Sequence, residues 1–396
     1  MQALRICILF LGINCGLGLL LAQENGFVIG TEHQIHSEIL HEERSYIVQL
    51  PASYENDDFY LEKRYPVAIL LDGGRLFHLS SGVISSLGAG GIEEIPEMIL
   101  VAVRNTNRNR DFLPTESMLS SSGERLDQLA ESGGAAAFHS FLSEELLPHI
   151  DSIYRTEPFR LLIGHSFAGL FAAYSMLEHE TFDAFLAIDP SLWWDDAWIV
   201  KRLEQNPPDR FARFYIAQAS NPFNPGPDVS QSGRAIQAFE ALMMQNRSLN
   251  FGYKYFPDED HFSVPLPALP NGLKMLFSDY RMPLASLAEQ DSSAIKQYYQ
   301  RLSQNMGYEV LPPGRLFNQI GMFLLSDSSR QEQALMLLRI NQRHYPESYL
   351  PWQSLGMAYE RLRRRPEAIE CYRQVLRLQP DNAYAQAGVE RLAESE

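Results

Sequence analysis

The sequence predicts an α/β domain with a mostly parallel central sheet, followed by an all-helical domain. Continuous apolar runs, typical of strands buried on both faces, alternate with helical stretches as far as about residue 280. This alternation favours right-handed crossovers and a parallel sheet that helices cover on both sides. The apolar runs cover residues 65–71, 98–103, 159–163, 184–188, 214–217 and 251–256. The helical stretches include residues 135–154, 168–177, 232–245 and 266–277.

An export signal is predicted at residues 1–22. Arg5 is the only charged residue before a nearly uninterrupted apolar stretch over 6–21, which is followed by Ala22. The stretch is shorter than the roughly 20 residues that span a bilayer, and no basic cluster follows it. A cleaved signal is therefore favoured over a membrane anchor, and the mature chain is expected in the periplasm or outside the cell with no membrane span. Cleavage near Ala22 would leave Cys371 as the one remaining cysteine.

The α/β domain is expected to cover residues 23–280. Polar and apolar residues alternate over 26–54, which predicts antiparallel strands at the edge of the sheet before the parallel strands begin. The carboxyl ends of parallel strands lie along one edge of a sheet. Catalytic groups are therefore expected in the loops that follow these strand ends.

The remaining residues, 281–396, predict a helical domain with tetratricopeptide repeats. Small and aromatic residues there follow the spacing of one repeat, in which small side chains let two antiparallel helices touch. These residues are Trp352, Leu355, Gly356, Tyr359, Ala368, Tyr372 and Pro380. Gly321, Ala334 and Pro346 echo the pattern about one repeat earlier, and a less regular helix is expected over 294–306. Such helices supply packing or a groove for a protein partner rather than chemistry.

Composition and charge exclude several classes of partner. The 396 residues are 45% hydrophobic and 21% charged, which is ordinary for a globular protein long enough for two domains. The formal charge of −16 would repel nucleic acid and anionic membrane surfaces. No pair of histidines has a recognisable metal-ligand spacing, so neither a metal nor another cofactor is predicted.

Residues 160–170 indicate a nucleophile elbow. An apolar strand runs into Gly164-His-Ser166-Phe-Ala168-Gly169, a small-residue turn that exposes Ser166 and opens a helix. A serine hydroxyl becomes an effective nucleophile when such a turn presents its oxygen to a base. The pattern departs mildly from Gly-x-Ser-x-Gly because Ala168 stands at the last position.

The base that Ser166 requires is predicted at His261. This histidine lies in the loop after the apolar run 251–256, where the histidine of an α/β-hydrolase belongs in chain order. An acid that orients the histidine often follows the strand that here ends at Ala217, which makes Asp228 the favoured candidate. Asp189, at the end of the run 184–188, competes with Asp228, and a Ser-His dyad without an acid is the third possibility.

An oxyanion hole needs two backbone N–H groups that are aimed at one point. The elbow supplies the N–H of Phe167, and the loop Asp72-Gly73-Gly74 after the first parallel strand supplies a second. We expect the second donor to be Gly74.

Six ordered sequence blocks resemble the esterase D family of α/β-hydrolases, a group of esterases that includes the siderophore esterases. The blocks are residues 65–73, 105–115, 141–148, 164–169, 190–194 and 260–261. The resemblance implies a serine esterase with Ser166 and His261 as nucleophile and base. It also implies that Asn105, Arg108, Arg110 and Asp111 lie near the substrate mouth. The chain departs from many relatives at Asn221, where an acid is common, and at Phe262, where glycine is common.

The predicted function is therefore the hydrolysis of a small-molecule carboxylic ester outside the cytoplasm, through an acyl-enzyme. Trp193 is expected to form part of an aromatic wall of the substrate pocket. The same site would permit acyl transfer to a sugar or lipid if water were excluded. A third interpretation is a binding protein in which the helical repeats carry the function.

Overall fold

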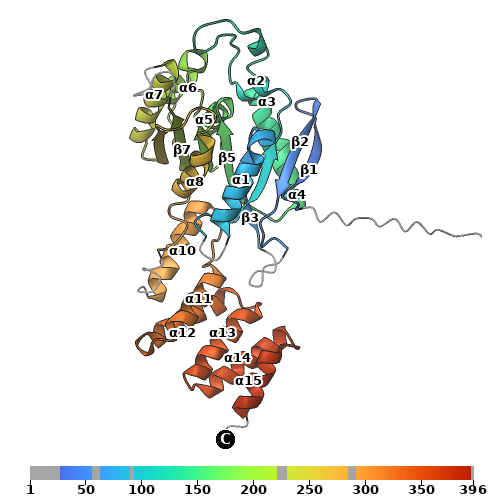
Figure 1. Cartoon of the computed structure of the whole chain (residues 1–396), viewed down its shortest axis with the longest axis vertical. Coiled ribbons are helices and arrows are strands. Elements are labelled where there is room, and N and C mark those ends of the chain that lie inside the picture. Colours follow the sequence, from blue (N-terminus) through green and yellow to red (C-terminus); the bar gives the residue numbers. More distant parts are fainter. Residues whose placement is uncertain (1–26, 56–62, 90–92, 221–229, 284–290, 394–396) are drawn as a thin grey trace, which may run out of the picture.

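The computed structural model describes residues 27–55, 63–89, 93–220, 230–283 and 291–393. Figure 1 shows an α/β part built on one sheet and a helical part that extends from one end of it. The predicted fold class is thus confirmed: a mostly parallel sheet with helices, followed by a helical region. The export signal predicted at residues 1–22 lies outside the described residues.

The sheet has eight strands among the described residues, in the order β1-β2-β4-β3-β5-β6-β7-β8. The first two strands form an antiparallel pair, and β2 joins β4 in antiparallel orientation, while the neighbouring pairs from β4 to β8 are parallel. The strands are β1 (Thr31–Ser37), β2 (Glu42–Gln49), β3 (Tyr65–Leu70), β4 (Ile99–Val103), β5 (Thr156–His165), β6 (Ala184–Ile188), β7 (Ala212–Ala219) and β8 (Leu249–Phe256).

The central strands are largely apolar because both of their faces are buried. In β3, Ala68 and Leu70 contribute to one hydrophobic core, while Val67 and Ile69 contribute to the other. Every residue of β3, β4, β6 and β7 is buried, as their continuous apolar runs predict. The last strand, β8, differs from the prediction. It lies at the edge of the sheet, where one side has no neighbour, and most of its residues are only half-buried.

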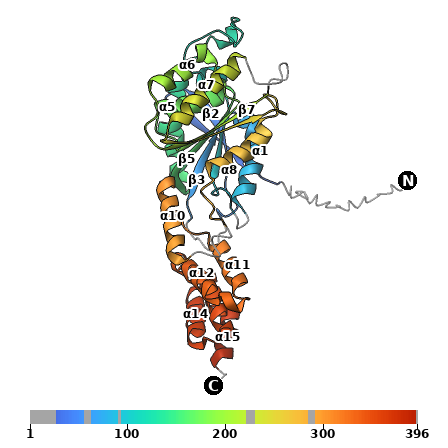
Figure 2. The same cartoon turned by 90° about the vertical axis from the view of Figure 1, so that its left-hand side faces the viewer.

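Helices cover the two faces of the sheet unequally, as Figure 2 shows with α1 and α8 on one side and α5 to α7 on the other. The first face is covered by α1 (Gly73–Gly88) and α8 (Pro265–Leu276). The second face is covered by a larger group. Its helices are α2 (Arg108–Phe112), α3 (Ala135–Ser140), the π-helical turn η2 (Phe141–Leu146), α4 (Leu147–Ile153), α5 (Phe167–Glu178), α6 (Trp194–Gln205) and α7 (Gln231–Gln245). A short turn of 3₁₀-helix, η1, spans Asp127–Leu129.

The helical part packs as antiparallel pairs, in agreement with the repeat spacing. In the second pair a Cβ at Gly356 would lie 2.8 Å from the Tyr372 ring, so only glycine allows this approach. In the first pair a Cβ at Gly321 would lie 2.7 Å from Leu338. The elements are α10 (Ser292–Met306), α11 (Gly314–Leu324), η3 (Ser328–Arg330), α12 (Gln331–His344), α13 (Tyr349–Arg361), α14 (Arg365–Leu378) and α15 (Ala383–Ala393).

The helical part joins the α/β part at the amino-terminal edge of the sheet. Arg213 near the start of β7 is fully buried and pairs with Asp279 at 2.5 Å. The Tyr298 hydroxyl of α10 donates to the carbonyl oxygen of Asp279 at 2.7 Å. Helix α8 starts at the carboxyl edge of the sheet and runs back to this junction. Its 12 residues span roughly 18 Å, which is the distance from the carboxyl edge to the junction. The helical part therefore lies away from the loops that follow the strand ends (Figure 1).

Candidate active site

Ser166 occupies a strained turn between β5 and α5. Its backbone adopts φ 63° and ψ −118°, a conformation that a residue other than glycine rarely takes. The turn is held by the Ser166 N–H, which donates to the carbonyl oxygen of Ile188 at 2.9 Å. Gly164 is required here, because a Cβ at this position would lie 2.1 Å from the carbonyl oxygen of Ala168. The geometry of a nucleophile elbow is thus present around a half-buried serine.

His261 faces the same region from the loop after β8, and a carboxylate fixes its ring. Its Nδ1 lies 2.6 Å from Oδ2 of Asp189, which follows β6. The other oxygen of Asp189 accepts from the N–H of Ala219 at 2.9 Å, so two neighbouring strand ends hold this carboxylate. Because Nδ1 is paired, the other ring nitrogen, Nε2, is the one that remains for a proton from a substrate or a nucleophile.

Among the described residues, the acid that contacts His261 is Asp189, the competing candidate of the sequence analysis. Asp228, the favoured candidate, stays a prediction. Residue 228 lies in the segment 221–229, outside the described residues. Asp189 reaches the histidine because its own backbone is in the left-handed region, with φ 39°, immediately after the buried strand β6. This conformation turns the carboxylate along the carboxyl edge of the sheet toward β7 and β8.

His165 supports His261, a role that the sequence analysis did not predict. Its side chain is buried. Its Nε2 lies 2.7 Å from the carbonyl oxygen of His261, and the two rings are 4.5 Å apart between centroids. Burial lowers the pKa of His165 to about 4, so the ring is neutral at physiological pH and donates from Nε2. A histidine beside the nucleophile is the only sequence signal for this contact.

The site opens into a cavity of about 520 Å³ at the carboxyl edge of the sheet. Ser166, His165 and His261 line this cavity together with residues from the loops after β3 and β4. The remaining lining residues are Asp72, Gly74, Arg75, Arg104, Asn105, Arg108 and Phe262. Thus Asn105 and Arg108 lie at the cavity, as the family resemblance implies.

Two helices begin at or beside this cavity. Gly74 is the second residue of α1, and Phe167 is the first residue of α5. N–H groups in the first turn of a helix have no acceptor within that helix, and the helix dipole favours negative charge near them. This placement is consistent with the two predicted oxyanion donors, since Gly74 lines the cavity and Phe167 directly follows Ser166.

A buried carboxylate, Asp72, ties these two helix starts together through Arg108. The Arg108 guanidinium donates to both oxygens of Asp72, at 2.8 and 2.9 Å, and to the carbonyl oxygen of His165 at 3.1 Å. The amide of Asn105 donates to Asp72 at 2.6 Å. Arg108 therefore fixes the position of Asp72, which precedes α1, relative to His165, which precedes Ser166. The sequence analysis had assigned no role to Asp72.

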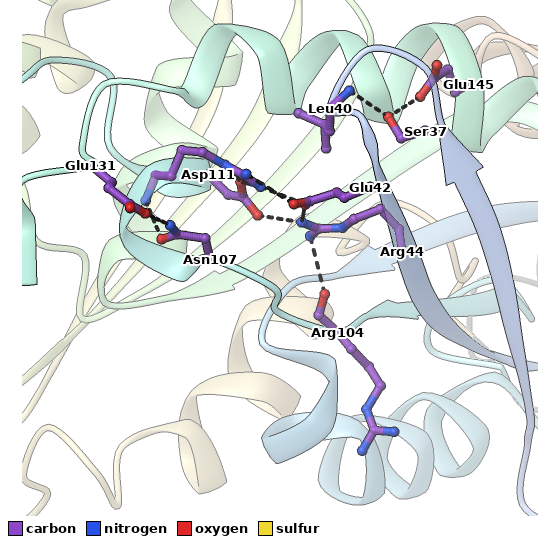
Figure 3. A network of polar contacts seen from close by, with 10 residues as sticks. Ser37, Leu40, Glu42, Arg44, Arg104, Asn107, Asp111, Glu131 and Glu145 are labelled. Atoms are coloured by element: carbon purple, nitrogen blue, oxygen red, sulfur yellow. Dashed lines mark hydrogen bonds and ion pairs between the residues drawn. The ribbon is translucent and has the colours of Figure 1, made fainter.

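Arg110 and Asp111, which were expected at the substrate mouth, belong instead to a network of ion pairs beside the site. Arg110 pairs with Glu42 at 2.7 Å, and Asp111 pairs with the buried Arg44 at 2.7 Å (Figure 3). The hydrogen bonds that the Arg110 guanidinium donates to Glu42 lower the pKa of the Glu42 carboxyl and raise the pKa of Arg110. Neither residue lines the cavity, because both side chains point toward β2 and anchor it to α2.

Trp193 takes no part in the cavity lining either. Its ring packs 6.1 Å from Phe167 and 6.0 Å from Trp194, measured between centroids. It thus packs against the residue that follows the nucleophile.

Asp111→Asn should lower the free energy of unfolding by about 3 kcal/mol, because it leaves the Arg44 charge buried beside fewer carboxylates. Arg44 and Asp111 are each only 1% exposed. Urea denaturation followed by circular dichroism measures the change. Glu370→Gln is the matched control, because Glu370 pairs with Arg377 on the exposed surface of α14, where both side chains are more than half exposed. Equal stability of the two variants would contradict a stabilising role for the buried network.

The described residues contain no cluster of metal ligands and no membrane-spanning helix. No three side chains of His, Cys, Asp or Glu there are grouped so that they could hold a metal ion. Within the same residues, no helix combines the length and the apolar character that crossing a bilayer requires. Cys371 is buried between helices, and burial raises the pKa of its thiol to about 12.

Comparison with known families gives two matches. A family model described as "Putative esterase" matches residues 37–241, which is just over half of the chain. A tetratricopeptide repeat model matches residues 350–382, where α13 and α14 form the second helical pair. Both agree with the families that the sequence motifs resemble.

Several known proteins are similar to this chain. The ferri-bacillibactin esterase BesA of Bacillus subtilis (strain 168) is 32% identical over 158 residues, which cover 35% of this chain and 52% of BesA. The siderophore enterobactin esterase of Emericella nidulans is 26% identical over 171 residues, covering 36% of this chain and 56% of that protein. The chain thus spans about half the length of these curated relatives. The crystal structure of an IroE-like serine hydrolase from Shewanella oneidensis is 31% identical, covers 80% of this chain and 99% of that chain, and has a TM-score of 0.68.

Proposed function

The chain belongs to this esterase family, and from that membership we propose that it is a serine esterase that cleaves a carboxylic ester through a covalent acyl-enzyme. The observation that carries the proposal is the 2.6 Å contact between Asp189 and His261, which lines the same cavity as Ser166 on its strained turn. The similarity to a serine hydrolase over 80% of the chain supports the same chemistry.

In the first half of the proposed reaction, Ser166 attacks the ester carbonyl. Its Oγ forms a bond to the carbonyl carbon while Nε2 of His261 accepts the hydroxyl proton. Asp189 stabilises the imidazolium that results, because its carboxylate is paired with Nδ1. The N–H groups of Gly74 and Phe167 stabilise the oxyanion. The tetrahedral intermediate then collapses, the ester C–O bond breaks, and His261 returns the proton to the departing alcohol.

In the second half, water replaces the alcohol. His261 accepts a proton from water while the water oxygen forms a bond to the acyl carbon. The tetrahedral intermediate then collapses, the bond to Ser166 Oγ breaks, and His261 returns the proton to this Oγ, which releases the carboxylic acid and restores the serine hydroxyl. The side chain of His261 is 39% exposed, so water has direct access to the base. This exposure favours hydrolysis over acyl transfer, which requires that water be excluded.

The names of the curated relatives suggest a siderophore ester as the natural substrate. The test is to assay the full chain on a panel of esters that includes short-chain aryl esters, cyclic tri-esters and feruloyl sugars. Hydrolysis of at least one ester is the expected result. A folded chain that hydrolyses none of them would contradict the esterase proposal and favour a binding protein.

We also propose that the mature chain acts in the periplasm or outside the cell. The apolar stretch over residues 6–21, preceded by Arg5 and followed by Ala22, supports this location. Sequencing the N-terminus of the protein recovered from each cell fraction tests it. A chain that keeps residue 1 and stays in the cytoplasm would contradict it.

We assign separate roles to the two parts of the chain: catalysis to residues 23–280 and binding of a protein partner or a large substrate to residues 281–396. The helical part contacts the amino edge of the sheet, opposite the cavity, which supports this division. Its apolar residues nevertheless continue the core that α1 and α8 form on the sheet.

A chain that ends at Tyr280 should therefore retain hydrolysis of small esters but be less soluble, because truncation uncovers apolar surface. Assays of kcat/KM for a short aryl ester, with circular dichroism as the check on folding, measure this against the full chain. Folded truncated protein without activity would show that the helical part helps to build the active site.

A further inference from the structure

The proposed catalytic cavity is cationic, although the whole chain is strongly acidic. Three arginines and one aspartate are among its lining residues, whereas the complete chain has a formal charge of −16. The aspartate, Asp72, is already neutralised by its paired contact with Arg108. The remaining arginines, Arg75 and Arg104, therefore set the charge that a substrate encounters.

These two arginines differ in how they are held. Arg104 pairs with Glu32 at 2.5 Å, and both side chains are about half exposed. Among the residues that the structure describes, no carboxylate lies within 4.0 Å of the Arg75 guanidinium. Arg75 is instead placed by an aromatic ring, with its guanidinium carbon 5.4 Å from the centre of the Phe262 ring. Phe262 is itself 72% exposed at the edge of the cavity.

Arg75 also stands next to the proposed reacting centre. It directly follows Gly74, one of the two proposed oxyanion donors, in the first turn of α1. Its contact partner Phe262 directly follows His261, the proposed base. An anionic group bound to Arg75 would therefore lie within a few bonds of an ester carbonyl placed between Gly74 and Ser166.

We infer that Arg75 makes this cavity select esters that carry a negative charge, such as a carboxylate, on their acid or alcohol portion. The inference rests on the proposed esterase function and adds the charge of the substrate and the residue that recognises it. A guanidinium donates two parallel hydrogen bonds to a carboxylate, and contact with the Phe262 ring limits its motion before the substrate arrives. Phe262 also offers its exposed ring to the apolar portion of the same substrate.

Two pairs of matched esters test the inference, because the members of each pair differ mainly in charge. Nitrophenyl hydrogen succinate and nitrophenyl methyl succinate place the charge on the acid portion. Acetoxybenzoate and its methyl ester place it on the alcohol portion. The quantity measured is the ratio of kcat/KM for the charged member to kcat/KM for the neutral member, at low ionic strength.

For the full wild-type chain we expect this ratio to be about ten in at least one pair, as for a charge-assisted hydrogen bond. Arg75→Gln should reduce the ratio to near one, and added salt should reduce it in the wild type. Arg377→Gln is the matched control. It removes one exposed arginine from α14, far from the cavity, and should leave the ratio unchanged. A wild-type ratio near one in both pairs, or an equal ratio in wild type and Arg75→Gln, overturns the inference.

Equilibrium binding separates this inference from the esterase proposal. The same esters are titrated into the full chain carrying Ser166→Ala, and into a second chain carrying both Ser166→Ala and Arg75→Gln. Tighter binding of a charged member that is lost in the double variant supports the inference even if the wild type hydrolyses neither ester. Equal binding of charged and neutral members overturns it, whether or not hydrolysis occurs.

Discussion

Replacing Ser166 with alanine should lower kcat for ester hydrolysis by roughly 10⁶-fold without unfolding the chain. The variant retains the oxyanion donors and the cavity but has no atom that can form the acyl-enzyme. The fold should persist because, among the residues that the structure describes, the one hydrogen-bond contact of Ser166 Oγ is long, 3.4 Å to Oγ of Ser191. Initial rates on a short-chain aryl ester measure the loss, and circular dichroism checks the fold.

Ser191→Ala is the matched control for this variant. Ser191 is a buried serine in the loop after β6, next to Ser166, and removal of its hydroxyl leaves the proposed nucleophile and base in place. We expect its kcat to stay within about tenfold of wild type. Full activity of Ser166→Ala would remove the elbow from the mechanism and require another nucleophile.

Asp189→Asn should lower kcat by about 10⁴-fold. The amide that replaces the carboxylate cannot stabilise the imidazolium of His261, and its NH₂ group favours the wrong tautomer of the ring. The loss should appear mainly in kcat, because Asp189 acts through His261 and does not line the cavity. Asp258→Asn is the control, since Asp258 is exposed in the loop before His261 and has no hydrogen bond to that ring among the described residues.

Asp228→Asn belongs in the same experiment. A loss of several orders of magnitude in Asp228→Asn, combined with near wild-type activity in Asp189→Asn, would return the role of the acid to Asp228. If all three variants keep near wild-type activity, the site works as a Ser-His dyad.

The strands and the elbow could be predicted because local sequence determines them. A strand buried on both faces is largely apolar, and the apolar runs within β3, β4, β6 and β7 show this directly. The tight turn at Gly164 leaves no room for a Cβ, so its glycine is also visible in the sequence. The edge position of β8 was not visible, because the order of strands in a sheet depends on long-range pairing.

The partners of charged side chains could not be predicted in the same way. Asp189 and Asp228 both follow predicted strands, and chain order alone favoured the second. In the structure Asp189 contacts His261, because its backbone has φ 39° and its carboxylate accepts from the N–H of Ala219. Arg110 and Asp111 stand in one motif with Arg108, yet only Arg108 faces the cavity, because successive residues of the short helix α2 point in different directions.

The most direct test of the central claim is to identify the residue that a fluorophosphonate modifies. Such a reagent forms a stable phosphorus–oxygen bond only with a hydroxyl that is activated for attack and placed beside an oxyanion hole. Peptide mapping by mass spectrometry, after reaction of the full chain, locates the adduct. We predict one adduct, on Ser166, that appears as esterase activity is lost and is absent from His261→Ala. Loss of activity with the adduct on another residue, or an unmodified Ser166 in an active enzyme, would contradict the assignment.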